Sequence, residues 1–135
     1  MSGTNFLIDT NIIIYLAQKK LKINDFAQEG DNLCISSITY MEALGFPFQD
    51  QQEEISITML CDIFKRISLT EEIEKQTILI RKMHKIKLPD AIIAATAMTH
   101  HLTLVTFNIS DFNKIFGLNL LVPSTSPPSP PASTF

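Results

Sequence analysis

The chain has 135 residues, close to the usual size of one domain, and 45% of them are hydrophobic, which is enough for one continuous core. Its formal net charge of −3 lacks the basic excess of most polyanion-binding proteins, so a role in RNA binding requires a bound cation or local basic patches. No stretch approaches the roughly 18 apolar residues of a membrane span, and the start lacks a signal-peptide pattern, so we expect a cytoplasmic protein without membrane contact.

Short apolar runs alternate along the chain with longer helix-like segments, which is typical of a parallel sheet joined by crossover helices. The predicted strands cover residues 5–8, 32–36, 64–69 and 102–107, with a short one near 119. The predicted helices cover residues 11–18, 38–45, 51–62, 71–86 and 90–100. We therefore predict an α/β fold of three layers, with a central parallel sheet of four to five strands flanked by helices.

Two of the predicted helices carry specific start signals. The Thr70 hydroxyl can cap the helix at 71–86, and the acids Glu71, Glu72 and Glu74 follow where the helix dipole favours negative charge. Pro89 suits a position just inside the start of the next helix.

The composition of the last residues of the chain indicates how the domain is organised. Residues 123–135 contain five of the seven prolines and no charged side chain, which predicts a disordered tail after a folded domain of residues 1–122. Cys34 and Cys61 lie in apolar surroundings without metal-ligand spacing, which fits buried thiols in a reducing compartment but leaves a disulfide open.

Four acidic residues follow the ends of predicted strands. Asp9 comes directly after the first strand, and Glu42 lies one turn into the helix after the second. Asp90 opens the helix at 90–100, and Asp111 lies just beyond the strand at 102–107. Because ligands bind at the carboxyl edge of open α/β sheets, we expect these four carboxylates to face one site.

Carboxylates gathered in this way repel one another unless a divalent cation supplies the missing positive charge. An all-oxygen ligand set selects Mg²⁺ or Mn²⁺ over zinc. Such a cation polarises phosphoryl oxygens and lowers the pKa of water, so phosphodiester hydrolysis is the natural use of the site.

Each acid also has a purely structural interpretation. Glu42 stands three residues after Thr39 in a capping-box pattern, while Asp9 and Asp90 suit helix caps and Asp111 suits the cap of a short turn. The coincidence of all four at one edge of the sheet favours a shared site.

Four blocks of the sequence together carry a resemblance: FLIDTNIIIYL, CISSITYMEAL, LPDAIIAATAMTHHLTLVTFN and SDF. In this order they resemble a PIN domain, specifically the VapC-like toxins of toxin–antitoxin systems, from about Phe6 to Val122. The resemblance implies a three-layer PIN-like fold and a Mg²⁺- or Mn²⁺-dependent endoribonuclease. It also implies a homodimer and a cognate antitoxin that inserts a peptide into the acidic groove.

The same resemblance implies a role for each matched residue. Asp9 and Asp90 match the acids that contact the metal directly, and Glu42 and Asp111 match acids that contact it directly or through water. Further polar positions match residues that orient the carboxylates and water: Asn11, Ser37, Thr106 and Asn108. Many relatives place an acid at the position of Asn108, so whether Asn108 or Asp111 completes the site stays open.

Other features allow two interpretations. The lysines at 82, 85 and 87 and those at 19, 20 and 22 are either ordinary solvated charges or contacts for RNA phosphates. Phe46 and Phe48 can pack on the core, form a dimer interface or receive an antitoxin helix. The histidines at 84, 100 and 101 lie on predicted helices or at their ends, which favours a structural role.

Alternative functions remain from the residues alone. A phosphatase of the haloacid dehalogenase type needs a second Asp at the position of Asn11. A receiver domain needs a Lys after a late strand, where VTFN offers none, so both are disfavoured. A catalytically silent PIN-like binding module, or a PIN nuclease of RNA processing without an antitoxin, stays open.

Overall fold

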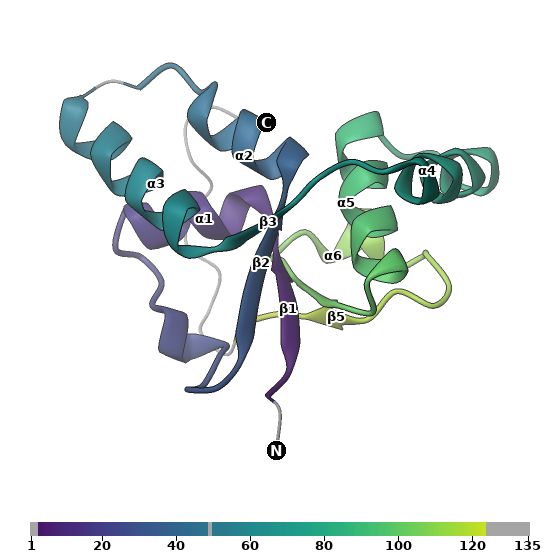
Figure 1. Ribbon diagram of the computed structural model, residues 1–135, viewed down its shortest axis with the longest axis horizontal. Coiled ribbons are helices and arrows are strands. Elements are labelled where there is room, and N and C mark those ends of the chain that lie inside the picture. Colours follow the sequence, from purple (N-terminus) through teal and green to yellow (C-terminus); the bar gives the residue numbers. More distant parts are fainter. Residues whose placement is uncertain (1–2, 49, 124–135) are drawn as a thin grey trace.

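The computed structural model describes residues 3–48 and 50–123 (Figure 1). Its centre is a parallel sheet of five strands in the order β3-β2-β1-β4-β5. The strands are β1 (Asn5–Ile8), β2 (Asn32–Ser36), β3 (Lys65–Ile67), β4 (Thr103–Val105) and β5 (Leu120–Leu121). The predicted α/β fold with a flanked parallel sheet is confirmed. The tail predicted over 123–135 lies, from residue 124 onward, outside the described residues.

Two strands begin one residue later than predicted, because the residue before each strand is used in another contact. The N–H of Phe64 still donates to the carbonyl of Leu60, 3.3 Å away, at the end of the preceding helix. The N–H of Leu102 likewise donates to the carbonyl of Ala97 at 2.8 Å. β3 and β4 therefore begin at 65 and 103 instead of 64 and 102. They also end before the predicted 69 and 107, at 67 and 105.

Each predicted helix is present, with small shifts at its ends. The helices are α1 (Thr10–Ala17), α2 (Ser37–Leu44), α3 (Gln51–Ile63), α4 (Glu71–Met83), α5 (Leu88–Thr99) and α6 (Ile109–Phe112), with a 3₁₀ helix η1 (Ile23–Asp25). The sequence did not predict α6 or η1. Thr70 caps α4 by accepting from the N–H of Ile73 at 3.3 Å, and Pro89 lies in the first turn of α5, as expected.

The helix α4 ends three residues before its predicted end at 86. His84 is already extended, with a φ of −139° and a ψ of 146°. Ile86 nevertheless packs against the core, so the apolar spacing that predicted a longer helix is used by a non-helical segment.

The sheet separates two apolar cores, each covered by its own helices. Adjacent strand residues point to opposite faces, so Leu7 packs with α4 and α5 while Ile8 packs with α1 and α3. Figure 1 shows α1 and α3 on one side of the sheet and α4 and α5 on the other. Both Leu7 and Ile8 have no exposed surface, so the sheet is buried on both faces as expected for a three-layer fold.

The parallel arrangement brings the carboxyl ends of the strands to one edge. β1 leads into α1 through Asp9 alone, and β2 leads directly into α2. The side chains that follow these strands therefore come from different elements but lie close together. In the part of the chain that the structure describes, no helix has the length and apolar character needed to cross a membrane.

Candidate active site

Asp9 lies at the junction of β1 and α1 and is 5% exposed. Its Oδ1 accepts from the N–H of Thr10 at 2.8 Å, and its Oδ2 accepts from the hydroxyl of Thr106 at 2.6 Å. The pKa of Asp9 is raised to about 7. Burial is the main cause, the two hydrogen bonds oppose it, and the charges of Asp90 and Glu42 raise the pKa further. Asp9 is therefore both the cap of α1 and a buried acid that faces other acids.

Glu42 projects from α2 toward the start of α1. Its Oε1 accepts from the hydroxyl of Thr10 at 2.8 Å, and this hydroxyl also lies 3.4 Å from that of Thr39. Burial raises the pKa of Glu42, while the hydrogen bond from Thr10 opposes the shift. The alternative capping-box interpretation is wrong, because α2 is capped by Ser36, which accepts from the N–H of Ile38, and Thr39 lies inside the helix.

Asp90 lies in the first turn of α5 and is half-buried. The residue that precedes this helix, Lys87, makes no side-chain capping bond, and neither does Asp90. Burial raises the pKa of Asp90, the charges of Asp111 and Glu42 raise it further, and that of Lys87 lowers it. Asp90 therefore responds to two other acids of the set across separate elements.

Asp111 and Asn108 form a pair around the start of α6. The Nδ2 of Asn108 donates to the Oδ2 of Asp111 at 2.8 Å, and the N–H of Asn108 donates to the hydroxyl of Thr106 at 2.9 Å. Since Thr106 also donates to Asp9, its hydroxyl links Asp9 to Asn108, and Asn108 in turn holds Asp111. The structure brings both Asn108 and Asp111 to the site, with the amide supporting the carboxylate.

The four acids surround one small cavity of about 100 Å³. Its walls are formed by Asp9, Thr10, Asn11, Glu42, Lys87, Asp90, Asn108 and Asp111. Ser37 is not among them, because its hydroxyl donates to the carbonyl of Ile67 at 3.2 Å. Thr106 does not line the cavity either, but its hydroxyl donates a hydrogen bond to Asp9. The sequence interpretation missed Thr10 as a site residue, although its place directly after Asp9 was an available signal.

The donor set of this cavity fits a hard divalent cation. Apart from Lys87, the walls offer carboxylate, amide and hydroxyl groups, and the Oδ1 of Asn11 is buried without a hydrogen-bond partner among the described residues. Within residues 3–48 and 50–123, however, no three acidic, histidine or cysteine side chains already stand close enough to hold a metal ion. The raised pKa values of Asp9, Glu42 and Asp90 come first from burial, and the charges of neighbouring acids raise those of Asp9 and Asp90 further.

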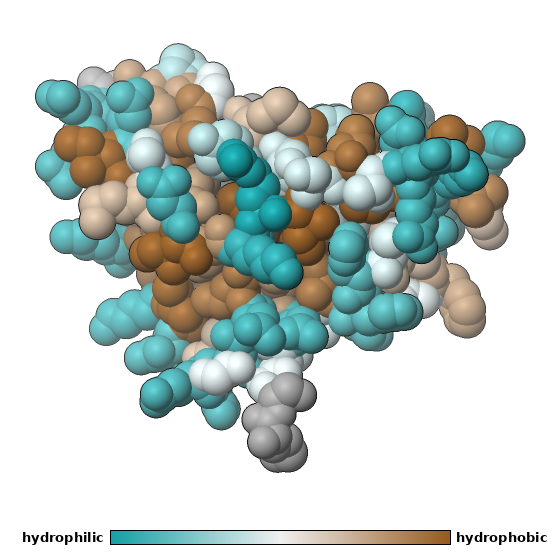
Figure 2. Space-filling model, viewed as in Figure 1, coloured by the Kyte–Doolittle hydropathy of each residue, from teal (hydrophilic) through white to brown (hydrophobic). Residues whose placement is uncertain are grey.

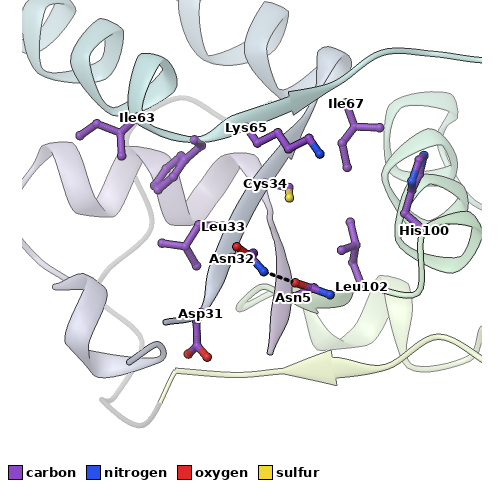
Figure 3. Close-up of a pocket in the computed structure, with 11 residues that line it drawn as sticks. Asn5, Asp31, Asn32, Leu33, Cys34, Ile63, Lys65, Ile67, His100 and Leu102 are labelled. Atoms are coloured by element: carbon purple, nitrogen blue, oxygen red, sulfur yellow. Dashed lines mark hydrogen bonds between the residues drawn. The ribbon is translucent and has the colours of Figure 1, made fainter. Parts of the chain in front are cut away.

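A larger hollow of about 620 Å³ lies at the opposite end of the strands and lacks this chemistry. It is lined near the starts of β1 and β2, where Asn32 donates to Asn5 at 2.6 Å (Figure 3). Its one acid, Asp31, accepts from the backbone N–H groups of Thr4 and Gln28. Figure 2 shows hydrophobic residues gathered in the middle of this view of the molecule, near β3, the edge strand of the sheet. The larger hollow therefore lacks the set of acids that surrounds the smaller cavity.

The remaining sequence predictions concern residues outside the acidic cavity. His84 and His100 occupy the positions that end α4 and α5, and His101 follows with a positive φ of 57°, so the histidines lie at helix ends. Phe46 and Phe48 are half-buried with ring centres 6.3 Å apart, and Phe48 packs against the core beside α1 and α3. Cys34 and Cys61 are both buried free thiols.

Comparison with known proteins identifies the family. The family model described as PIN domain matches residues 6–116. The chain is 32% identical over 130 residues to "Ribonuclease VapC1" of Rickettsia felis, covering 88% of this chain and 96% of that protein. It is 28% identical over 129 residues to "Ribonuclease VapC2" of Haemophilus influenzae, covering 84% of this chain and 93% of that protein.

Solved structures agree with this match. A toxin–antitoxin complex from Klebsiella pneumoniae contains a chain that is 34% identical, with a TM-score of 0.68 over 84% of this chain and 94% of that one. The structure of VapBC-1 from nontypeable Haemophilus influenzae is similar, with 28% identity and a TM-score of 0.71 over 88% of this chain and 98% of that one. The four-acid cavity, the family match and these relatives agree: the chain belongs to the PIN-domain family, among the VapC ribonucleases.

Proposed function

We propose that this protein is a metal-dependent endoribonuclease and the toxin of a toxin–antitoxin pair. The observation that carries the proposal is the convergence of Asp9, Glu42, Asp90 and Asp111 on one cavity of about 100 Å³. Relatives over nearly the whole chain are named ribonucleases, which supports the reaction class. PIN-domain ribonucleases of this type depend on a divalent metal ion, and the oxygen donors of this cavity favour Mg²⁺ or Mn²⁺.

In this proposal the acids have unequal roles. Asp9 and Asp90 would hold the metal directly, and Glu42 and Asp111 would hold it directly or through water. A bound divalent cation supplies Lewis-acid stabilisation of the phosphodiester and lowers the pKa of the attacking water. Thr106 and the N–H of Thr10 fix the orientation of the Asp9 carboxylate.

The supporting polar residues complete the arrangement. Asn108 fixes Asp111 through its side-chain amide, and the unpartnered Oδ1 of Asn11 can accept a hydrogen bond from a water in the cavity. Ser37, whose hydroxyl is used by the carbonyl of Ile67, would affect the site only through the start of α2.

We further propose that the partners are RNA, a cognate antitoxin and a second copy of the chain, in the cytoplasm. Similar solved structures include a toxin–antitoxin complex, which supports the antitoxin. The acidic cavity accounts for silencing, because a basic side chain of an antitoxin can supply the positive charge that the carboxylates lack. A PIN nuclease without an antitoxin has no observation in its favour here.

The proposed function is tested with purified protein, a pooled RNA substrate and Mg²⁺, Mn²⁺ or a chelator. We expect cleavage only with metal, and a loss of at least about 100-fold in Asp9→Asn and Asp90→Asn, since each removes a proposed metal ligand. The matched control is Asp62→Asn, which removes an exposed acid of α3 far from the cavity.

Unchanged cleavage in chelator, or in both acid variants, would rule out the metal-dependent nuclease. A metal-induced rise in melting temperature with no cleavage of any RNA would instead identify a silent binding module. Circular dichroism of each variant separates loss of the site from loss of the fold.

A further inference from the structure

A second cavity, of about 450 Å³, adjoins the acidic cavity. It is lined by Arg81, Lys85, Ile86, Lys87 and Asp111. Lys87 and Asp111 also line the acidic cavity, so the two cavities meet at these side chains. We call the second cavity the basic groove, because three of its five lining residues carry positive charge.

The basic groove and the acidic cavity have opposite charge although they share a wall. The single acid of the groove, Asp111, has its Oδ2 occupied by the amide of Asn108. Arg81, Lys85 and Lys87 make no ion pair among the described residues. The chain has a net charge of −3, yet positive charge is concentrated in this groove. These cations can attract an anionic ligand that approaches the acidic cavity.

The segment that carries these cations is held in place by two side chains from separate elements. The Nε of Arg81, on the last turn of α4, donates to the carbonyl of Ile86 at 3.3 Å. The Nζ of Lys114, just after α6, donates to the carbonyl of Lys85 at 2.7 Å. The bond from Lys114 ties the cationic segment to the part of the chain that carries Asp111, so the spacing between groove and acids is fixed.

The side-chain nitrogens of the basic groove that make no hydrogen bond among the described residues are suited to bind a phosphate. The bond from Nε orients the guanidinium of Arg81 and leaves its two terminal nitrogens without a hydrogen bond in the described chain, in a fork that matches phosphate oxygens. Lys85 and Lys87 have exposed side chains that can reach the same ligand. Ile86 adds a half-buried apolar surface against which a sugar or base can pack.

We propose that the basic groove binds the RNA backbone next to the cleaved bond, through a phosphate held by Arg81 and Lys85. This rests on the proposed function, because a strand whose phosphodiester lies at the acids must leave the cavity on some side. The groove is the exit that shares a wall with the acids and carries compensating charge. The other basic group, at 19, 20 and 22, is exposed and lines neither cavity.

The test compares two double variants that remove the same charge. Arg81→Gln/Lys85→Gln removes two cations of the groove, and Lys20→Gln/Lys22→Gln removes two exposed cations outside it. Binding of a fluorescent single-stranded RNA is measured in chelator, where no cleavage occurs, and KM and kcat are measured with metal.

We expect the groove variant to bind RNA about tenfold more weakly, with a salt dependence of log Kd reduced by about 1. KM should rise by a similar factor, while kcat stays within about twofold, because no acid is altered. The control variant should match the wild type within about twofold in each measurement.

The single variant Lys85→Gln controls for a folding defect. The hydrogen bond from Lys114 goes to the backbone carbonyl of residue 85, so the substitution does not remove it. It should show the same effect at a smaller size. Equal losses in both double variants, or no loss in the groove variant, would overturn the proposal. So would a groove variant that binds RNA normally but loses affinity for an acidic peptide. Absence of cleavage by the wild type would count against the proposed function alone, since the binding assay in chelator still tests the groove.

Discussion

At the scale of single residues, hydroxyl groups determine how the acids are held. Thr106 has no exposed surface, and its one hydroxyl donates to Asp9 and accepts from the N–H of Asn108. Thr10 similarly connects the start of α1 to Glu42 on α2. These bonds orient carboxylates that would otherwise move apart by mutual repulsion. Thr10 and Thr106 are therefore positioning residues of the site.

The contact between Thr10 and Glu42 gives the first prediction. Thr10→Val keeps the size of a buried side chain but removes the hydroxyl that donates a hydrogen bond to Glu42 over 2.8 Å. A hydrogen bond to a charged group contributes about 1.5–3 kcal/mol, so we expect kcat/KM to fall by about tenfold or more. RNA cleavage at saturating metal measures the effect.

Thr10→Ser is the control for this prediction, because it restores the donor while removing only a methyl group. The serine variant should recover most of the lost activity, which a defect in packing alone would not allow. If Thr10→Val and Thr10→Ser have the same kcat/KM for RNA cleavage, the hydroxyl of Thr10 has no role in positioning Glu42.

At the scale of elements, the position of Asp90 depends on how closely α5 lies against its neighbours. Ala91, Ala94, Ala95 and Ala97 are buried in the core between α5, α4 and the sheet. Small side chains on the buried face allow a helix to approach its neighbours closely, and Asp90 stands one turn before Ala94. The alanine-rich sequence of α5 therefore determines where this carboxylate lies.

Enlarging that face should destabilise the protein. Ala94 has no exposed surface, so Ala94→Leu overpacks the core and should lower the free energy of unfolding by about 1–3 kcal/mol. Urea unfolding followed by circular dichroism measures it. The control, Ile78→Ala on α4, alters a side chain that is 54% exposed and should change stability by less than about 0.5 kcal/mol. Equal stability of Ala94→Leu and the wild type would mean that α5 packs loosely.

The elements were predictable from the sequence where one pattern covers several residues. The apolar runs of β1 and β2 match the structure, as do the cap at Thr70 and the position of Pro89. The helix α6 was missed because four residues are too short to show a helical period. α4 was predicted too long because the apolar Ile86 fits a helical period without being in the helix.

The site was predictable to the level of which strand each acid follows, but not to the level of contacts. Thr10 and Glu42 are 32 positions apart, so no local pattern announces their hydrogen bond. Ser37 and Glu42 share α2, yet five residues turn a helix by about 140° beyond one full turn, which directs them to different faces. Local patterns give the faces of elements, whereas the partners of a buried polar group depend on tertiary packing.

At the scale of the whole molecule, the gathered acids affect the stability of the fold. The pKa of Asp9 is raised from 3.8 to about 7, first by burial, and those of Glu42 and Asp90 are raised for the same reason. Between these two values the folded chain keeps a proton on Asp9 that the unfolded chain releases. Stability therefore falls as pH rises through this window, and levels off above it where Asp9 is ionised in both states.

This linkage predicts that, in chelator, the melting temperature is higher at about pH 5 than at pH 7, and changes little from there to about pH 8. One proton contributes a slope of at most about 1.4 kcal/mol per pH unit. Asp9→Asn, which cannot ionise, should reduce the slope to the part that Glu42 and Asp90 contribute, and should stabilise the metal-free protein near neutral pH. Mg²⁺ or Mn²⁺ should stabilise the wild type most above about pH 7, because the cation binds the ionised carboxylates, and should stabilise Asp9→Asn less. A profile that rises with pH, or one that keeps its slope in Asp9→Asn, would show that the buried carboxylate does not oppose folding.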